Sequence, residues 1–159
     1  MIAMAGRRGF VWPILALALA ARLAAAVWIH TSLERDSQRE FVIAGDAAGY
    51  WELGRNLAFG EGLTAHDPPR RVMRMPGFPA LIAVSVRIFG ENLLPLRILL
   101  AFVGTATCWL VFLLGRSLFD ETIGLIAAGW CAVSPVMVGF SPLILSETLF
   151  AACLTLSLL

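Results

Sequence analysis

Residues 11–29 read VWPILALALAARLAAAVWI, and this stretch decides the class of fold. A helix rises about 1.5 Å per residue, so the stretch is long enough to cross a hydrocarbon core roughly 30 Å thick. Trp12 and Trp28 mark its ends like an aromatic belt, and Arg7 and Arg8 precede it. Positive residues favour the cytoplasmic side. We therefore expect a membrane span with a cytoplasmic N-terminus.

A cleaved signal peptide is the alternative for this first segment, because Ala24–Ala26 resembles a small-residue cleavage site. The length of the segment and Arg22 within it fit an uncleaved span better. An unpaired charge at that depth would cost several kcal/mol, so Arg22 must snorkel to the interface or meet a buried partner.

The composition of the whole chain supports a membrane protein. Of its 159 residues 59% are hydrophobic and 14% are charged, against about 25% charged in soluble domains. The net charge of +1 excludes an electrostatic nucleic-acid binder, so we expect membrane lipids and no nucleic acid as partners. The three cysteines lie in separate apolar segments, which indicates packing residues rather than a disulfide framework or a zinc site.

Further apolar stretches at residues 93–115, 123–140 and 143–159 predict three more spans. Residues 30–92 carry most of the acidic residues and form the predicted external loop. The predicted fold is therefore an all-α, multi-pass transmembrane protein whose large first external loop contains juxtamembrane helices. We expect it in the cell (inner) membrane.

Two helices are predicted within the loop. One runs from Ala47 to Phe59 and stops at the glycines that follow it. The other covers residues 80–89 and is too short to span, so we place it beside the membrane. With that topology Asp46 and Glu147 emerge on the same external face.

These two carboxylates are the candidate catalytic residues. Asp46 is either the N-cap of the first loop helix or a general base that takes a proton from an acceptor hydroxyl. Glu147 is an ionisable residue inside an apolar run, which favours a functional role over interfacial snorkelling. Tyr50, one turn after Asp46, is either an interfacial anchor or a residue that lines the pocket.

Arg74 adjoins the turn at Pro76 and is placed to hold a phosphate by charge-assisted hydrogen bonds. His66 and Asp67 are weak candidates for binding a divalent metal together with another acid. No residue is assigned as a metal ligand, and no cofactor is assigned apart from a candidate divalent metal.

Five motifs in order along the chain resemble GT-C membrane glycosyltransferases: GDAAGY at 45–50, LGRNLAFGEG at 53–62, RMPGFP at 74–79, LGRSLF at 114–119 and SPLILSETLF at 141–150. The most similar branch is the bacterial relatives of protein O-mannosyltransferases and of the lipid A aminoarabinose transferase (glycosyltransferase 39-related).

The resemblance implies an inverting transfer of a sugar from a polyprenyl-phosphate donor to a lipid, glycan or protein acceptor on the non-cytoplasmic face. Asp46 then matches the catalytic acid of the first external loop and Glu147 the second acid. Tyr50, Arg74 and Arg55 are the expected substrate-binding residues. Some members of the family bind a divalent metal.

Members of this family have more spans than the four expected here, so the chain is expected to be the N-terminal part of a GT-C domain, residues 1–159. The alternatives are a non-enzymatic membrane protein, either a transporter fragment or an assembly subunit, and an inactive truncated remnant. A transporter would line a path with polar residues along its spans. Here the polar residues gather in one loop, which argues against that class.

Overall fold

The computed structural model describes residues 7–36, 39–65, 70–71 and 74–159. A 3-10 turn, η1 (Arg7–Phe10), leads into helices α1 (Val11–Arg35), α2 (Ala44–Phe59), α3 (Gly77–Phe89), α4 (Leu93–Leu118), α5 (Glu121–Val133), α6 (Pro135–Phe140) and α7 (Glu147–Ser157). Two short antiparallel strands, β1 (Thr64–Ala65) and β2 (Arg70–Arg71), lie between α2 and α3. The predicted all-α class is confirmed.

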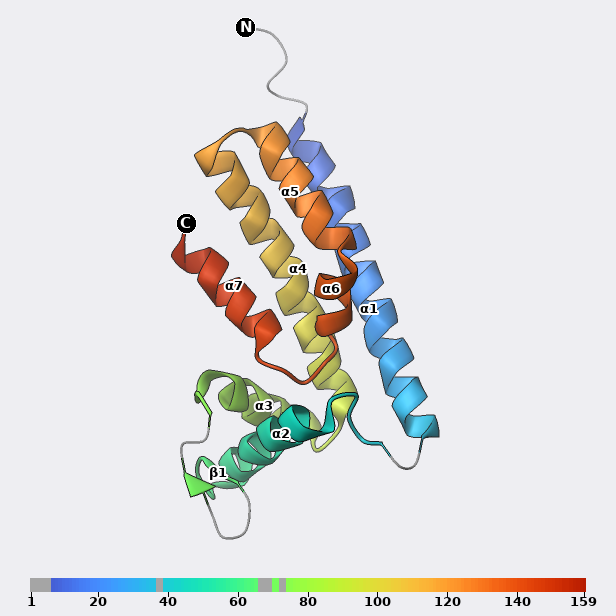
Figure 1. The fold of residues 1–159 in the computed structure, drawn as a ribbon, viewed down its shortest axis with the longest axis vertical. Coiled ribbons are helices and arrows are strands. Elements are labelled where there is room, and N and C mark those ends of the chain that lie inside the picture. The colour runs from blue at the N-terminus through green and yellow to red at the C-terminus, as the bar shows by residue number, and fades with distance from the viewer. Residues whose placement is uncertain (1–6, 37–38, 66–69, 72–73) are drawn as a thin grey trace, which may run out of the picture.

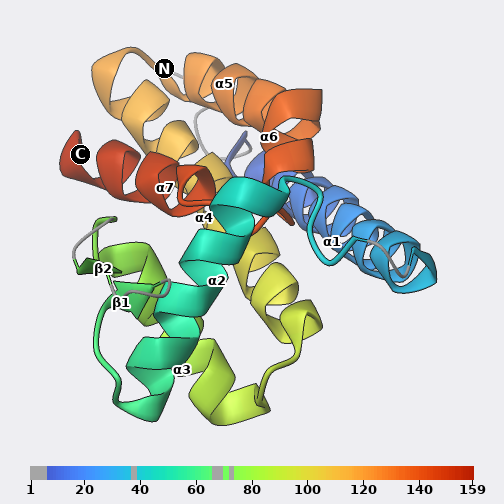
Figure 2. The same ribbon diagram turned by 60° about the horizontal axis from the view of Figure 1, so that its bottom comes forward.

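The helices form an upright bundle with a second layer across one end (Figure 1). Helix α1 runs toward that end, and α4 and α7 run away from it. Among the described residues, α1 and α4 are the helices long and apolar enough to cross a membrane. Figure 2 brings the lower end forward and shows α2 and α3 side by side across it.

The α2–α3 layer has a core of its own, which also contacts the start of α4. It comprises the buried apolar residues Phe41, Ala47, Trp51, Ala58, Phe78, Ile82, Ala83, Val86, Leu96, Leu100 and Ile144. The two helices approach closely at Gly54, where a Cβ would fall 2.3 Å from Ile82 Cγ2. As predicted, α2 ends at Gly60, whose φ of 87° favours glycine.

The predicted third span, residues 123–140, is two helices rather than one. Proline 135 has no N–H and disfavours helical geometry in the residue before it. Ser134 accordingly has φ −58° and ψ 119°, α5 ends at Val133, and α6 restarts at Pro135. The fourth predicted segment, 143–159, contains α7 after a turn at 141–146. The continuous apolar run from 123 to 140 conceals the break, and Pro135 is its one local signal.

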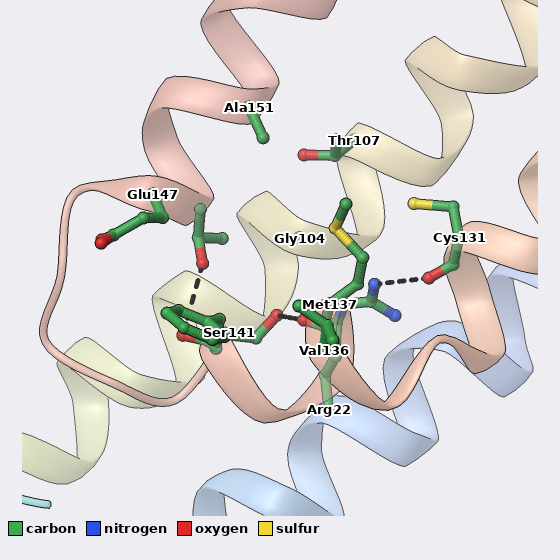
Figure 3. A pocket seen from close by; sticks show the side chains of 11 residues that line it. Arg22, Gly104, Thr107, Cys131, Val136, Met137, Ser141, Glu147 and Ala151 are labelled. Carbon is green, nitrogen blue, oxygen red and sulfur yellow. Dashed lines mark hydrogen bonds between the residues drawn. The ribbon is translucent and has the colours of Figure 1, made fainter.

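The break leaves backbone carbonyls of α5 without their helical partners, and Arg22 of α1 replaces those partners. Pro135 cannot donate to the carbonyl four residues earlier, that of Cys131. Arg22 Nη2 donates to Cys131 O at 3.0 Å, and Nη1 donates to Ala132 O at 3.4 Å and Ala18 O at 3.1 Å. The Arg22–Cys131 bond is visible in Figure 3. Arg22, 1% exposed, thus has the buried partner that its position in a span requires.

The interface of α1, α4 and α5 is built from small residues around this arginine. Ala18, Cys108 and Ala132 are fully buried together, and the thiols of Cys108 and Cys131 lie 3.3 Å apart. At Gly104 of α4 a Cβ would fall 2.8 Å from Arg22 Nε. The absence of a side chain there makes room for the guanidinium.

We predict that Arg22→Met destabilises the protein by about 3 kcal/mol, because two interhelical hydrogen bonds from a charged donor are lost and carbonyls are left unpaired. Thermal unfolding in detergent, followed by circular dichroism, measures the effect. Arg35→Met, at the exposed end of the same helix, is the control and should shift the transition little. Equal shifts for the two variants would contradict the capping role of Arg22.

Candidate functional site

Asp46 lies in the first turn of α2 and is not its N-cap. The helix begins at Ala44, earlier than predicted, and its N-cap, Ile43, makes no side-chain hydrogen bond. The Asp46 carboxylate instead accepts a hydrogen bond from Arg74 Nη2 in a salt bridge. The N-cap alternative is therefore wrong, since a guanidinium and not a backbone N–H is the partner of this carboxylate.

Arg74 lies just before α3 and holds two groups of α2 at once. Besides pairing with Asp46, its Cζ lies 4.3 Å from the centroid of the Tyr50 ring, a cation–π contact. The hydrogen bond to Asp46 raises the pKa of Arg74 above its ordinary value, against the opposing effect of burial. The Arg74 side chain is 25% exposed and that of Asp46 is 60% exposed. Arg74 is therefore a fixed positive charge at the edge of solvent.

Tyr50 joins this pair to the start of α7. Its hydroxyl lies 3.0 Å from the Ser146 hydroxyl, and its ring packs edge-to-face on Phe78 of α3 at 5.0 Å between centroids. Ser146 is the residue directly before Glu147 in the chain. A continuous set of contacts thus runs from Asp46 through Arg74 and Tyr50 to the residue beside Glu147.

A cleft of about 810 Å³ lies between these elements. Its polar wall contains Tyr50, Arg74, Ser146 and Glu147, and apolar side chains, among them Phe78 and residues of α7, form the rest. The lining does not include Asp46. A ligand with a charged head and an apolar tail fits such a division of polar and apolar surface.

Glu147 begins α7 and is exposed. It also lines a separate, mostly apolar pocket of about 270 Å³, and Arg22 lines the same pocket. Figure 3 shows the Glu147 carboxylate pointing away from Arg22, so the two charges are not partners. The charge of Arg22 faces backbone carbonyls, which leaves Glu147 available to the cleft.

The structure places four of the five predicted site residues in or beside the cleft: Tyr50, Arg74 and Glu147 line it, and Asp46 pairs with Arg74. Arg55 is not among them. It pairs with Glu91 at 3.2 Å and does not line the cleft. Ser146 was missed, although its place beside Glu147 within the motif at 141–150 was a usable signal.

The predicted metal candidates, His66 and Asp67, lie outside the described residues. Within the part of the chain that the structure describes, no group of three or more His, Cys, Asp or Glu side chains is arranged to hold a metal. Asp46 faces a guanidinium rather than a second carboxylate, and that donor set does not fit a cation.

A family model described as dolichyl-phosphate-mannose-protein mannosyltransferase matches residues 68–159, more than half of the chain. The chain belongs to this family. Searches of curated proteins and of solved structures found no match. Membership identifies a membrane glycosyltransferase of the GT-C type. The matched segment contains Arg74, Ser146 and Glu147, whereas Asp46 and Tyr50 precede it.

We predict that Tyr50→Phe and Ser146→Ala are coupled in their effects on stability, because each removes the same hydrogen bond. Each single change should cost about 1 kcal/mol, and the double variant should cost little more than one of them. Thermal unfolding of the four proteins measures the coupling. Ser157→Ala, which removes a hydroxyl bonded within α7, should add independently to Tyr50→Phe. Fully additive effects of Tyr50→Phe and Ser146→Ala would contradict the link.

Proposed function

We propose that this protein transfers a sugar from a polyprenyl-phosphate donor to a hydroxyl of a lipid, glycan or protein acceptor on the non-cytoplasmic face of the membrane. The family description names dolichyl-phosphate-mannose as donor and protein as acceptor, which favours this donor class and makes mannose the first sugar to test. The observation that carries the proposal is the cleft whose polar wall combines Arg74, Tyr50 and Glu147, with Asp46 paired to Arg74.

The donor phosphate would bind Arg74, because a guanidinium forms paired, charge-assisted hydrogen bonds with phosphate oxygens. The apolar side chains of α7 that line the cleft, Leu149 and Phe150 among them, would contact the start of the isoprenoid chain. The charged head and the apolar chain of the donor would thus contact different walls of the cleft.

The reaction would form one bond at the anomeric carbon of the sugar and break another. The acceptor oxygen attacks that carbon from the side opposite the phosphate, and its proton passes to the Asp46 carboxylate. The bond between the anomeric carbon and the phosphate oxygen breaks, and the polyprenyl phosphate leaves with a second negative charge that Arg74 stabilises. Attack from the opposite side inverts the anomeric configuration. Glu147 would orient the acceptor by accepting a hydrogen bond from it.

The shape of the lower layer supports its proposed place beside the membrane. Helix α3 buries one face, including Phe78, Ile82 and Val86, against α2 and α4. Its opposite face exposes Val84 and Ile88. At 13 residues it is roughly 20 Å long, too short for a hydrocarbon core of about 30 Å. A helix with an apolar outer face and this length fits the interface.

The packing of α1 supports its retention in the protein. Arg22 of α1 satisfies the carbonyls at the end of α5, and Ala18 packs on the helices α4 and α5. A cleaved signal peptide would leave those carbonyls unpaired. We therefore favour a membrane-spanning α1 with a cytoplasmic N-terminus over the signal-peptide alternative.

We predict that Asp46→Asn lowers the transfer rate about 10²- to 10⁴-fold, the usual contribution of a general base. Glu147→Gln should lower it about tenfold through loss of a charged hydrogen-bond acceptor. The assay follows transfer of radiolabelled mannose from polyprenyl-phosphate-mannose by the membrane-embedded protein.

Glu61→Gln is the matched control, because it removes one exposed carboxylate just beyond the end of α2 and should leave the rate unchanged. If Asp46→Asn transferred mannose as fast as Glu61→Gln, Asp46 would not be the base.

A further inference from the structure

Asp46 is both the proposed base and the partner of the proposed phosphate ligand. Arg74 Nη2 donates to Asp46 Oδ1, and Arg74 lines the cleft while Asp46 does not. The carboxylate is thus paired with a guanidinium that faces the space that a substrate would occupy.

A carboxylate in this position has one of its two oxygens engaged by Arg74. That oxygen accepts a hydrogen bond from a cation, and the carboxylate is not among the groups that line the cleft. Release of Arg74 would leave both oxygens of Asp46 available to accept a proton from a substrate hydroxyl.

The contact with Tyr50 shows how Arg74 can leave Asp46 and stay in the site. Its guanidinium already lies over the Tyr50 ring at 4.3 Å, and Tyr50 is held by its hydrogen bond to Ser146 and its packing on Phe78. Both Tyr50 and Arg74 line the cleft. A guanidinium that slides along a fixed ring toward the cleft keeps the cation–π contact while it exchanges one anion for another.

We propose that the Asp46 carboxylate occupies the anion position of Arg74 in the absence of ligand, and that a phosphate group entering the cleft displaces it. The identity of that phosphate as the donor's rests on the proposed function. Displacement frees the Asp46 carboxylate in the same step that fixes the phosphate on Arg74. Binding of the phosphate thus frees Asp46 to act as a base. When only the acceptor is bound, the carboxylate stays paired with Arg74.

This exchange has an unusual consequence for binding. If Asp46 competes with phosphate for Arg74, removing its charge strengthens phosphate binding, although the same change abolishes the base. Exposed ion pairs contribute modestly, so Asp46→Asn should tighten binding about two- to fivefold. If Asp46 instead supported the binding site, neutralising it would weaken phosphate binding.

The test measures binding of a polyprenyl phosphate without a sugar to the membrane-embedded protein. Cys153 lines the cleft and is exposed, so bound ligand should protect its thiol from a maleimide. Mass spectrometry of the alkylated site gives the half-protective concentration. Cys108 is buried and should stay unmodified in every variant, which reports that each variant is folded.

The expected result is a half-protective concentration about two- to fivefold lower for Asp46→Asn than for the unmodified protein. Glu61→Gln removes the same charge from the same layer and should bind as the unmodified protein does. In an Arg74→Gln background binding should be weak, and adding Asp46→Asn should not strengthen it.

Three results would overturn the proposal: no protection of Cys153 in the unmodified protein, unchanged or weaker binding by Asp46→Asn, or an equal gain from Asp46→Asn with and without Arg74. The matching polyprenol, which lacks the phosphate, should show no dependence on Asp46. Failure of mannose transfer in the presence of the Asp46-dependent binding would refute the proposed function and leave the exchange standing.

Discussion

The structure depends on a hydrogen-bonding constraint inside the bundle: Arg22 replaces the donors that Pro135 removes. In an apolar medium an unpaired carbonyl costs several kcal/mol, and a lone buried guanidinium costs more. The carbonyls and the guanidinium pair with each other, since Arg22 donates to Cys131 O and Ala132 O. This contact ties α1 to α5 and ends α5 at a fixed level. The chain then continues through α6 toward the α2–α3 layer (Figure 1).

The candidate site is built where that return brings the start of α7 to the lower layer. Asp46 and Tyr50 come from α2, Arg74 from the segment before α3, and Ser146 and Glu147 from the start of α7. The Tyr50–Ser146 hydrogen bond joins the two layers at the cleft. The break at Pro135 precedes α6 and the loop at 141–146, whose Ser146 contacts Tyr50.

The ion pair between Asp46 and Arg74 changes how the two residues are understood. Taken separately, one is a candidate base and the other a candidate phosphate ligand. In the proposed exchange, each stays paired with the other until an anion enters the cleft. The exposure of Asp46, 60%, and of Arg74, 25%, is compatible with such an exchange, because neither charge has to be carried into an apolar interior.

The sequence by itself determined the all-α membrane class and the end of α2 before Gly60, and it offered as candidates the four residues that lie in or beside the cleft. Those features follow from local rules: apolar length, the positive φ that glycine tolerates, and the rarity of acids in apolar runs. Only the tertiary structure decided that α5 and α6 are separate, that Arg22 caps α5, that Arg55 pairs with Glu91, and that Arg74 rather than a backbone N–H holds Asp46. The physical reason is that each of these depends on which partner a polar group finds across the fold. Hydrogen bonds and ion pairs between residues 28 or 109 positions apart leave no periodic trace in the chain.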